Sequence, residues 1–201
     1  NMDGGGSSII SARYPGLDSC SVISSPSDGT MRKGANYILF VNTGDSSMPT
    51  SSIAVYPQNT VMLTGASLDL KACAYNQDCF PTEQLSDCFY ILNGGGSISN
   101  DIYTADNFSG TVEIAAQSGF ITGQPTKITV VDAPESFYLV KHGTSEKIYS
   151  LALEPDEQID IDVIASDGLR TIISSDELFS FTFSGNAGTV DKTGLLSASS
   201  L

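Results

Sequence analysis

Short runs of alternating or β-branched residues recur along the whole chain, each bounded by Gly, Pro, Asn, Asp or Ser. Alternation places every second side chain on one face of a strand, whereas the three- and four-residue spacing of a helix is nearly absent. The pattern predicts an all-β fold. The predicted strands are Ser8–Tyr14, Tyr37–Asn42, Ser52–Tyr56, Ser67–Ala74, Thr111–Gln117, Thr126–Val131, Ser136–Val140, Gln158–Ile164 and Leu178–Phe183.

Two stretches divide the chain into segments. The residues around 43–52 are small and polar, as in a linker, and the joint at Asp132–Glu135 contains Pro134, which disfavours continuation of the preceding strand. We therefore expect four parts. They are 1–43, the end of one domain; 44–51, a linker; 52–132, a β-sandwich; and 133–201, a second β-sandwich.

An internal repeat relates the two predicted sandwiches. Three pairs of runs match in order and in the phase of their apolar residues: 66–76 with 157–167, 89–98 with 181–190, and 102–105 with 195–198. Two copies of one β module explain this most simply. The second copy stops before its last two strands, and the sequence begins at Asn1, so we expect the chain to be part of a longer protein.

The close of the second copy reads Gly188-Thr189-Val190-Asp191-Lys192-Thr193-Gly194-Leu195-Leu196-Ser197-Ala198. This pattern resembles the bacterial immunoglobulin-like domains of cell-surface and secreted proteins. The resemblance covers the chain from about Ser52 onward and implies immunoglobulin-like β-sandwich modules in tandem. It implies little about function, because such modules serve many.

The balance of charge restricts the partners. Nine Lys and Arg against 23 Asp and Glu give a formal charge of −14, which repels nucleic acid and anionic membrane surfaces. No run approaches the 18 or so apolar residues that a spanning helix needs. We expect no nucleic-acid partner and no membrane span.

The four cysteines leave two readings open. A bridge between Cys73 and Cys79, or from either to Cys88, suits an exported protein, whereas free thiols suit an anaerobic surface protein. A zinc site is not expected, because Cys20 is remote and His142 is the only histidine.

A glycine-rich motif, Asp3-Gly4-Gly5-Gly6-Ser7-Ser8, leads into the first predicted strand. Successive glycines expose N–H groups that can converge on a phosphate, the hydroxyls add donors, and a carboxylate can transfer protons. Alone, such a run is more often only a turn. The similar run at Asn93–Ser97, which the repeat places at a module turn, illustrates that alternative.

The residues that follow the glycine-rich motif favour a functional role for it over a simple turn. Pro26-Ser27-Asp28-Gly29, then Arg32, Ala35-Asn36 and a closing apolar strand come in a fixed order after it. This order resembles the C-terminal end of the phosphodiester glycosidase family, which includes the uncovering enzyme. The resemblance covers about residues 1 to 43. Lys33-Gly34 departs from it, because an apolar pair is common there.

The resemblance implies an active-site edge without a metal or cofactor. It makes Asp3 and Ser7 catalytic, and it makes Gly4, Gly5, Gly6, Ser8, Arg32 and Asn36 substrate-binding. Arginine suits a phosphodiester because its planar fork binds two oxygens, although a surface arginine that caps a turn is the plain alternative. Asp28 is better suited to shaping a turn than to catalysis.

Two further groups of polar residues are weaker candidates for a functional site. Asp156, Glu157, Asp160 and Asp162 could attract Ca²⁺, but alternation puts Asp160 and Asp162 on one face of a strand, which favours a solvated face. His142 is expected in a loop, and one loop histidine builds no Ser/His/Asp triad.

Two functions follow from these patterns. The first is a secreted or cell-surface bacterial hydrolase acting on sugar-phosphate diesters, on a glycan, a cell-wall polymer or a host glycoconjugate, with accessory modules. The second is a noncatalytic surface protein whose modules serve as spacers or adhesive units. Both place the chain outside the cell or at its surface. Because most of the catalytic domain is not in this sequence, we expect the chain alone to be inactive.

Overall fold

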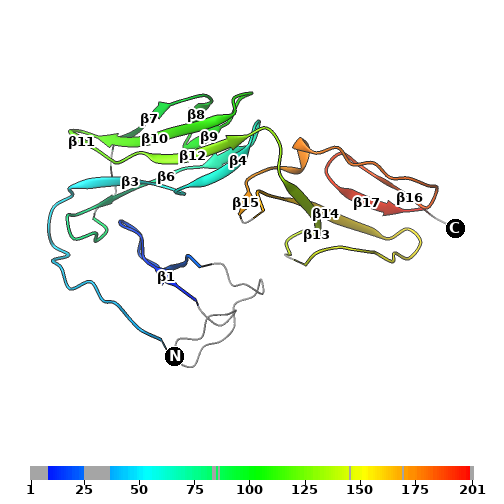
Figure 1. Ribbon diagram of the computed structural model, residues 1–201, viewed down its shortest axis with the longest axis horizontal. Coiled ribbons are helices and arrows are strands. Elements are labelled where there is room, and N and C mark those ends of the chain that lie inside the picture. The colour runs from blue at the N-terminus through cyan, green and yellow to red at the C-terminus, as the bar shows by residue number, and fades with distance from the viewer. Residues whose placement is uncertain are drawn as a thin grey trace. The chain divides into compact units, whose positions relative to one another are not determined.

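The computed structural model describes residues 9–24, 37–82, 85, 87–144, 146–168 and 170–199, and these residues form short strands joined by tight turns (Figure 1). Strands hold 44% of the residues and helix 2%, which confirms the predicted all-β fold. One turn of 3₁₀ helix, η1, spans Asp176–Leu178. Within these described ranges, no helix has the length and apolar character that a membrane span requires.

The chain folds into two compact units that interleave along the sequence. The first contains residues 1–56, 71–91 and 115–126, and the second contains residues 57–70, 92–114 and 127–201. Three strands pass from one unit into the other: β7 (Cys88–Asn93), β10 (Gly110–Ser118) and β12 (Thr126–Val131). Since the units are not consecutive segments, the boundaries at residues 43, 51 and 132 stay predictions.

Antiparallel pairs of strands build the first unit. Its own strands are β1 (Ser11–Ala12), β2 (Ser21–Val22), β3 (Ser52–Tyr56), β6 (Lys71–Tyr75) and β11 (Ile121–Thr122). β1 pairs with β2, β11 pairs with the end of β10, and β3 pairs with β6 from Ser52 opposite Tyr75 to Tyr56 opposite Lys71. Ile53 and Val55 of β3 are fully buried, as expected for a short β-branched run.

The second unit contains the same three-stranded arrangement twice. Its strands are β5 (Ser67–Asp69), β9 (Ile102–Thr104) and β8 (Ser97–Ser99), and then β14 (Gln158–Ser166), β17 (Leu195–Ala198) and β16 (Gly188–Val190). In each set the middle strand is antiparallel to both neighbours. Tyr103 of β9 and Leu196 of β17 occupy equivalent places, each opposite an apolar residue on both sides, which supports the internal repeat.

The remaining strands complete two five-stranded sheets. They are β4 (Thr60–Leu63), β13 (Ser136–Lys141) and β15 (Thr171–Ile172). One sheet has the order β11-β10-β12-β4, with β7 also on β10, and the other has the order β13-β14-β17-β16, with β15 also on β14. β4 runs parallel to β12, and its Val61 and Leu63 exchange backbone hydrogen bonds of 2.9 Å with Ile173, which follows β15.

Apolar side chains from the strands form the core. The largest fully buried ones are Tyr103, Ile53, Met62, Ile114, Ile128, Val55, Val112, Val130 and Val140. Burial of such side chains contributes about 1.5–3 kcal/mol each. Asn76 is the exception among them, a fully buried polar side chain whose partners are described below.

Two predicted strands are wrong. The predicted strand Tyr37–Asn42 has no regular secondary structure, and the predicted strand Leu178–Phe183 does not form, since Leu178 ends η1 and residues 179–183 after it are irregular. The first run is continuously apolar rather than alternating, and its backbone lacks a neighbouring strand among the described residues. Leu178 ends η1 instead of beginning a strand, because Asp176 bonds the backbone of Val163 and turns the chain there.

Other predicted strands differ from the structure in extent. Of Ser8–Tyr14, only Ser11–Ala12 is a strand in the described part, and Ser67–Ala74 is divided at Leu70, whose backbone N–H bonds Asp101 O at 2.7 Å. The predictions for Ser52–Tyr56 and Thr126–Val131 agree with β3 and β12 residue for residue.

Candidate functional site

The residues of the predicted active-site edge lie outside the described part of the chain. They are Asp3, Gly4, Gly5, Gly6, Ser7, Ser8, Arg32 and Asn36. What the structure describes is the hairpin between the two motifs and the segment that follows them. These neighbours are the part of the chain next to the predicted site that the structure describes.

A two-stranded hairpin joins the two motifs. Ser11 is opposite Val22 and Ala12 is opposite Ser21, and beyond these pairs the N–H of Ile23 donates to Ile10 O at 2.8 Å. The N–H of Ile10 donates to Ser24 Oγ at 2.9 Å. The first described residues after the glycine-rich motif thus lie beside the last ones before residue 25.

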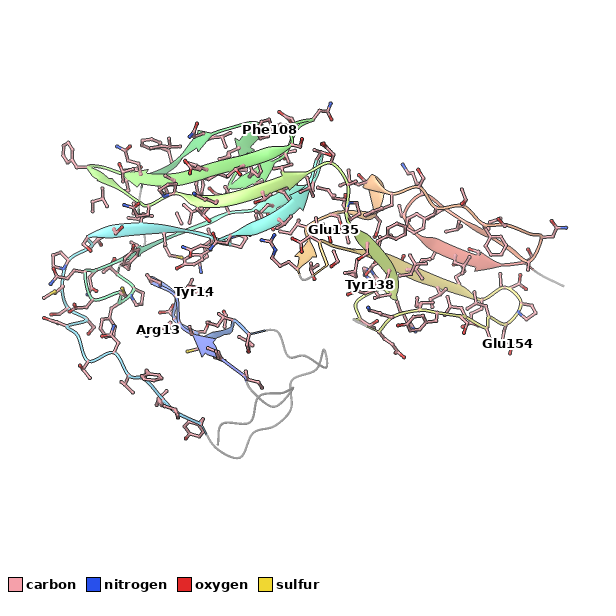
Figure 2. The ribbon with its side chains drawn as sticks, viewed as in Figure 1. Arg13, Tyr14, Phe108, Glu135, Tyr138 and Glu154 are labelled. Carbon is pink, nitrogen blue, oxygen red and sulfur yellow. The ribbon has the colours of Figure 1, made fainter. Side chains whose placement is uncertain are left out.

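The turn after β1 packs against the β3–β6 pair. Tyr56 Oη donates a hydrogen bond to Pro15 O at 2.6 Å, and the rings of Tyr14 and Tyr56 lie 6.1 Å apart. Gly16 has a φ of +78°, and a Cβ there would lie 2.9 Å from Cys73 Cβ, so only glycine fits this approach. Figure 2 shows Tyr14 on the segment that follows β1.

The environment of Tyr56 disfavours its ionised form. Burial is the main cause, followed by the charges that Cys73, Tyr75, Tyr14 and Cys79 would carry, and together they raise the pKa of Tyr56 to about 12. The hydroxyl therefore stays protonated and remains a donor to Pro15 O at any ordinary pH.

An aromatic contact and a second attachment point extend this packing. The Arg13 guanidinium lies over the Phe80 ring, 5.3 Å from its centre. Farther along, Asn42 Nδ2 donates to Asp78 O at 2.5 Å, and the N–H of Asp45 donates to Asp78 Oδ2 at 2.9 Å. The stretch predicted to be a linker thus bonds the loop at residues 76–80.

Asn76 organises that loop from inside. Its Oδ1 accepts the N–H groups of Asp78 and Phe80, both at 3.0 Å, and its Nδ2 donates to Asp45 O at 2.8 Å. A buried amide that is satisfied on both sides fixes the turn. Sequence reasoning missed this role, although Asn side chains are known to accept the backbone N–H two residues on and so to stabilise a turn.

Several apolar side chains of the hairpin and of the segment 37–41 are exposed to solvent. Tyr37 to Val41 are 68–92% exposed, and the hairpin residues Ile10 and Ile23 are 61% and 48% exposed. Exposed apolar runs of this kind are unusual on a monomer surface and indicate a surface that something else covers.

The cysteines of the first unit differ in burial. Cys20, Cys73 and Cys79 form no disulfide in the structure, and Cys88 is half-buried. Burial raises the pKa of the Cys73 thiol, which disfavours the reactive thiolate.

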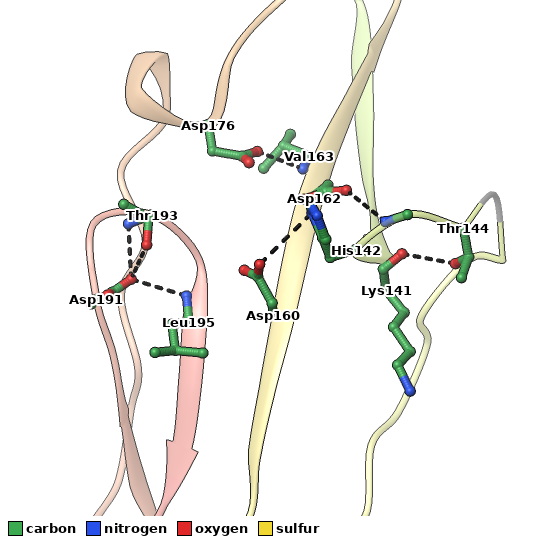
Figure 3. A network of polar contacts seen from close by, with 11 residues as sticks. Lys141, His142, Thr144, Asp160, Asp162, Val163, Asp176, Asp191, Thr193 and Leu195 are labelled. Atoms are coloured by element: carbon green, nitrogen blue, oxygen red, sulfur yellow. Dashed lines mark hydrogen bonds and ion pairs between the residues drawn. The ribbon is translucent and has the colours of Figure 1, made fainter.

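A histidine and two carboxylates form the clearest polar cluster in the described part of the second unit (Figure 3). His142 follows β13, and its Nδ1 lies 2.8 Å from Asp162 Oδ1 and 3.7 Å from Asp160 Oδ2, both on β14. The N–H of Gly143 donates to Asp162 Oδ2 at 3.3 Å. Alternation along β14 does place the two carboxylates on one partly solvated face, with Ile161 buried between them.

The carboxylates of this cluster stabilise the charged form of the histidine. The hydrogen bond of His142 to Asp162 and the negative charges of Asp162, Asp160 and Asp176 raise the pKa of His142, and burial opposes them. Among the residues that the structure describes, no group of three or more His, Cys, Asp or Glu side chains is arranged to hold a metal ion. The sequence placed His142 in a loop but gave no signal for its carboxylate partners.

We expect the pKa of His142 to depend on Asp162. In an NMR titration the pKa should lie above the ordinary 6.5 in the native chain and return toward 6.5 in Asp162→Asn. His142 is the only histidine, so its imidazole signals need no assignment. Because the folded pKa is the higher one, the contact stabilises the fold below about pH 6.5, and this stabilisation is lost as pH rises through the folded value.

The control for this titration is Asp106→Asn, which removes an exposed carboxylate elsewhere and should leave the histidine pKa as in the native chain. Equal pKa values in the native chain and in Asp162→Asn would contradict the contact. The effect on stability should be small, since both partners reach solvent.

Comparison with known proteins adds no relative. No model of a known protein family matches the chain, and the comparison with curated proteins gave no significant match.

Proposed function

We propose that the chain is the C-terminal part of a phosphodiester glycosidase, in which residues 1–43 form one edge of the active site and the β modules follow. The β1–β2 hairpin is the observation that carries the proposal. Ile9 directly follows Ser8, and Ser24 directly precedes Ser25, while the bond from Ile10 N–H to Ser24 Oγ joins the two strands. Neighbouring strands lie about 5 Å apart. The two motifs are therefore attached at adjacent positions, as one site requires.

The chemistry assigned to this site is the hydrolysis of a sugar-1-phosphate diester. Water adds to the anomeric carbon as its bond to the phosphate oxygen breaks, and the products are the free sugar and a phosphate monoester. The leaving phosphate carries the developing charge. The Gly4 to Gly6 N–H groups and the Arg32 fork would hold that charge, with Asp3 transferring the proton.

The other residues of the set have supporting roles. The hydroxyls of Ser7 and Ser8 would hydrogen-bond phosphate or sugar oxygens, and the amide of Asn36 would orient the sugar. No step requires a metal ion or an organic cofactor.

The exposed apolar side chains of residues 9–24 and 37–41 also support the proposal. Ile10, Ile23 and the run Tyr37 to Val41 suit a surface that the rest of a catalytic domain covers. The charge of −14 suits a protein that works in an aqueous exterior rather than on nucleic acid.

A second function, that of a noncatalytic surface protein, is favoured by the repeated strand order of β5-β9-β8 and β14-β17-β16. Stacked copies of one β module serve as spacers or adhesive units without any catalytic residue. Under this alternative, residues 1–43 are only an additional hairpin on the first module.

The bond that is cleaved tests the proposal. The complete protein that contains this chain is incubated with a chromogenic sugar-1-phosphate diester in H₂¹⁸O, and the products are analysed by mass spectrometry. A glycosidase places ¹⁸O on the anomeric hydroxyl of the sugar. Label on the phosphate would show a different reaction, and the absence of turnover with an intact fold would favour the noncatalytic alternative.

A further inference from the structure

We infer that the β3–β6 pair and the loop at residues 76–80 form a seat that holds the β1–β2 hairpin, so that the hairpin and this part of the β-sandwich open and close as one unit. The inference rests on the proposed function in one respect only: it takes the residues attached to the hairpin to be the proposed active-site edge. The term "seat" below means Tyr56, Cys73, Asn76, Asp78 and Phe80.

The first attachment is the turn at residues 13–16. Three contacts of different kinds converge on it: a hydrogen bond of 2.6 Å from Tyr56 to Pro15 O, a cation–π contact of 5.3 Å between Arg13 and Phe80, and the close approach of Gly16 to Cys73. A backbone carbonyl that accepts a half-buried tyrosine hydroxyl loses a partner if the turn moves away. The turn is therefore held in one place rather than resting loosely on the surface.

The second attachment is the segment at residues 42–45, which returns to the same loop. Asp78 accepts the N–H of Asp45 through its carboxylate and the Asn42 amide through its backbone carbonyl, while Asn76 donates to Asp45 O. A Cβ at Gly44 would lie 2.6 Å from Asp78 Cβ, so the backbone approaches as closely as glycine allows.

Both attachments therefore use the end of β6 and the loop after it. Phe80 contacts Arg13 and Asp78 contacts Asp45, although 32 positions separate Arg13 from Asp45 in the sequence. A segment tied at both ends to one loop cannot swing as a module on a flexible linker does. The seat thus makes the β3–β6 pair and the loop at residues 76–80 a structural part of the proposed catalytic unit.

Hydrogen exchange on the full chain tests the inference with variants on the seat and a readout on the hairpin. Tyr56→Phe removes the hydroxyl that Pro15 O accepts, and Phe80→Leu removes the ring under Arg13. The amides of Leu17 and Ile23, which bond Tyr14 O and Ile10 O, should exchange about five- to tenfold faster in either variant. The amide of Gly123, bonded to Ala116 O, reports the sandwich and should change less.

The matched control is Tyr149→Phe, which removes the same hydroxyl from a tyrosine that is 90% exposed. It should leave both hairpin amides at their native rates. The inference is overturned if Leu17 and Ile23 accelerate no more than Gly123 in both seat variants. Hydrogen exchange does not depend on turnover. A protein that is inactive, but whose hairpin amides respond to the seat variants, would therefore contradict the proposed function and still support the seat.

Discussion

Replacing Tyr103 by alanine is expected to lower the free energy of unfolding by about 3–5 kcal/mol, as for other large aromatic-to-alanine changes in a core. Tyr103 is the middle residue of β9 and has no exposed surface. Its ring lies opposite Leu68 of β5 and Ile98 of β8, so its removal leaves a cavity between three strands.

The hydroxyl of Tyr103 accounts for a smaller share of that effect. It donates to Gly95 O at 3.0 Å, and burial raises the pKa of Tyr103, so the donor stays protonated. Tyr103→Phe should therefore cost about 1 kcal/mol, the usual net value of one hydrogen bond. The difference between the two variants separates ring packing from the hydrogen bond.

Urea unfolding of the native chain and the two variants measures both values. Phe120→Ala is the control, because Phe120 is fully exposed and its removal should change stability by less than about 0.5 kcal/mol. A cost for Tyr103→Ala equal to that of Tyr103→Phe would contradict the packing described for β9.

The sequence predicted β12 correctly because its alternation agrees with burial on one side: Thr126, Ile128 and Val130 are buried, and Lys127 and Thr129 are exposed. It also predicted β3 correctly, although Ile53, Ala54 and Val55 of that strand are all buried. The repeat was also visible in the sequence, because Tyr103 and Leu196 occupy equivalent places in matching runs. Pairing of β9 and β17 with their neighbours follows from that phase.

The failed strand predictions have a common cause. The apolar run 37–41 of the predicted strand Tyr37–Asn42 would suit a buried strand, but a strand also needs a neighbour for its backbone hydrogen bonds, and periodicity says nothing of that neighbour. At Leu178 the carboxylate of Asp176 decides the local structure through a bond to Val163 N–H at 2.9 Å. A contact between residues 13 positions apart leaves no periodic trace.

The two glycine runs are similar in local sequence but are assigned different roles. Asn93–Ser97 is the module turn that the repeat predicted, and a Cβ at Gly95 would overlap the Phe108 ring. Nothing in the letters alone separates this run from Asp3–Ser8. The order of the following motifs makes that distinction, and the hairpin between them supports it.

The seat of the hairpin could not be predicted from the sequence. Two of its contacts, at Pro15 O and at Asp78 O, use backbone carbonyls, which every residue possesses. Another depends on the absence of a side chain at Gly16. Asn76 and Asp78 are residue types that favour turns, but a turn preference does not name a contact partner.

Under the proposed function, loss of turnover on removing Arg32 or Asp3 is the second large effect we expect. Without the Arg32 guanidinium, the leaving phosphate would lose two hydrogen bonds in the transition state. Arg32→Ala should therefore lower kcat/KM by about 100- to 1000-fold. Asp3→Ala removes the group that transfers the proton, which costs about 100-fold or more. The matched control is Asp28→Ala, since Asp28 is assigned to a turn and should retain most of the activity.

The central claim is tested most directly by measuring kcat/KM of the complete protein and these three variants on a sugar-1-phosphate diester, by the rate at which the free sugar is released, with circular dichroism to show that each variant is folded. The account predicts that the native protein and Asp28→Ala hydrolyse the substrate, while Asp3→Ala and Arg32→Ala lose at least about 100-fold. Unchanged turnover in Asp3→Ala and Arg32→Ala, or no turnover by the folded native protein, would contradict it.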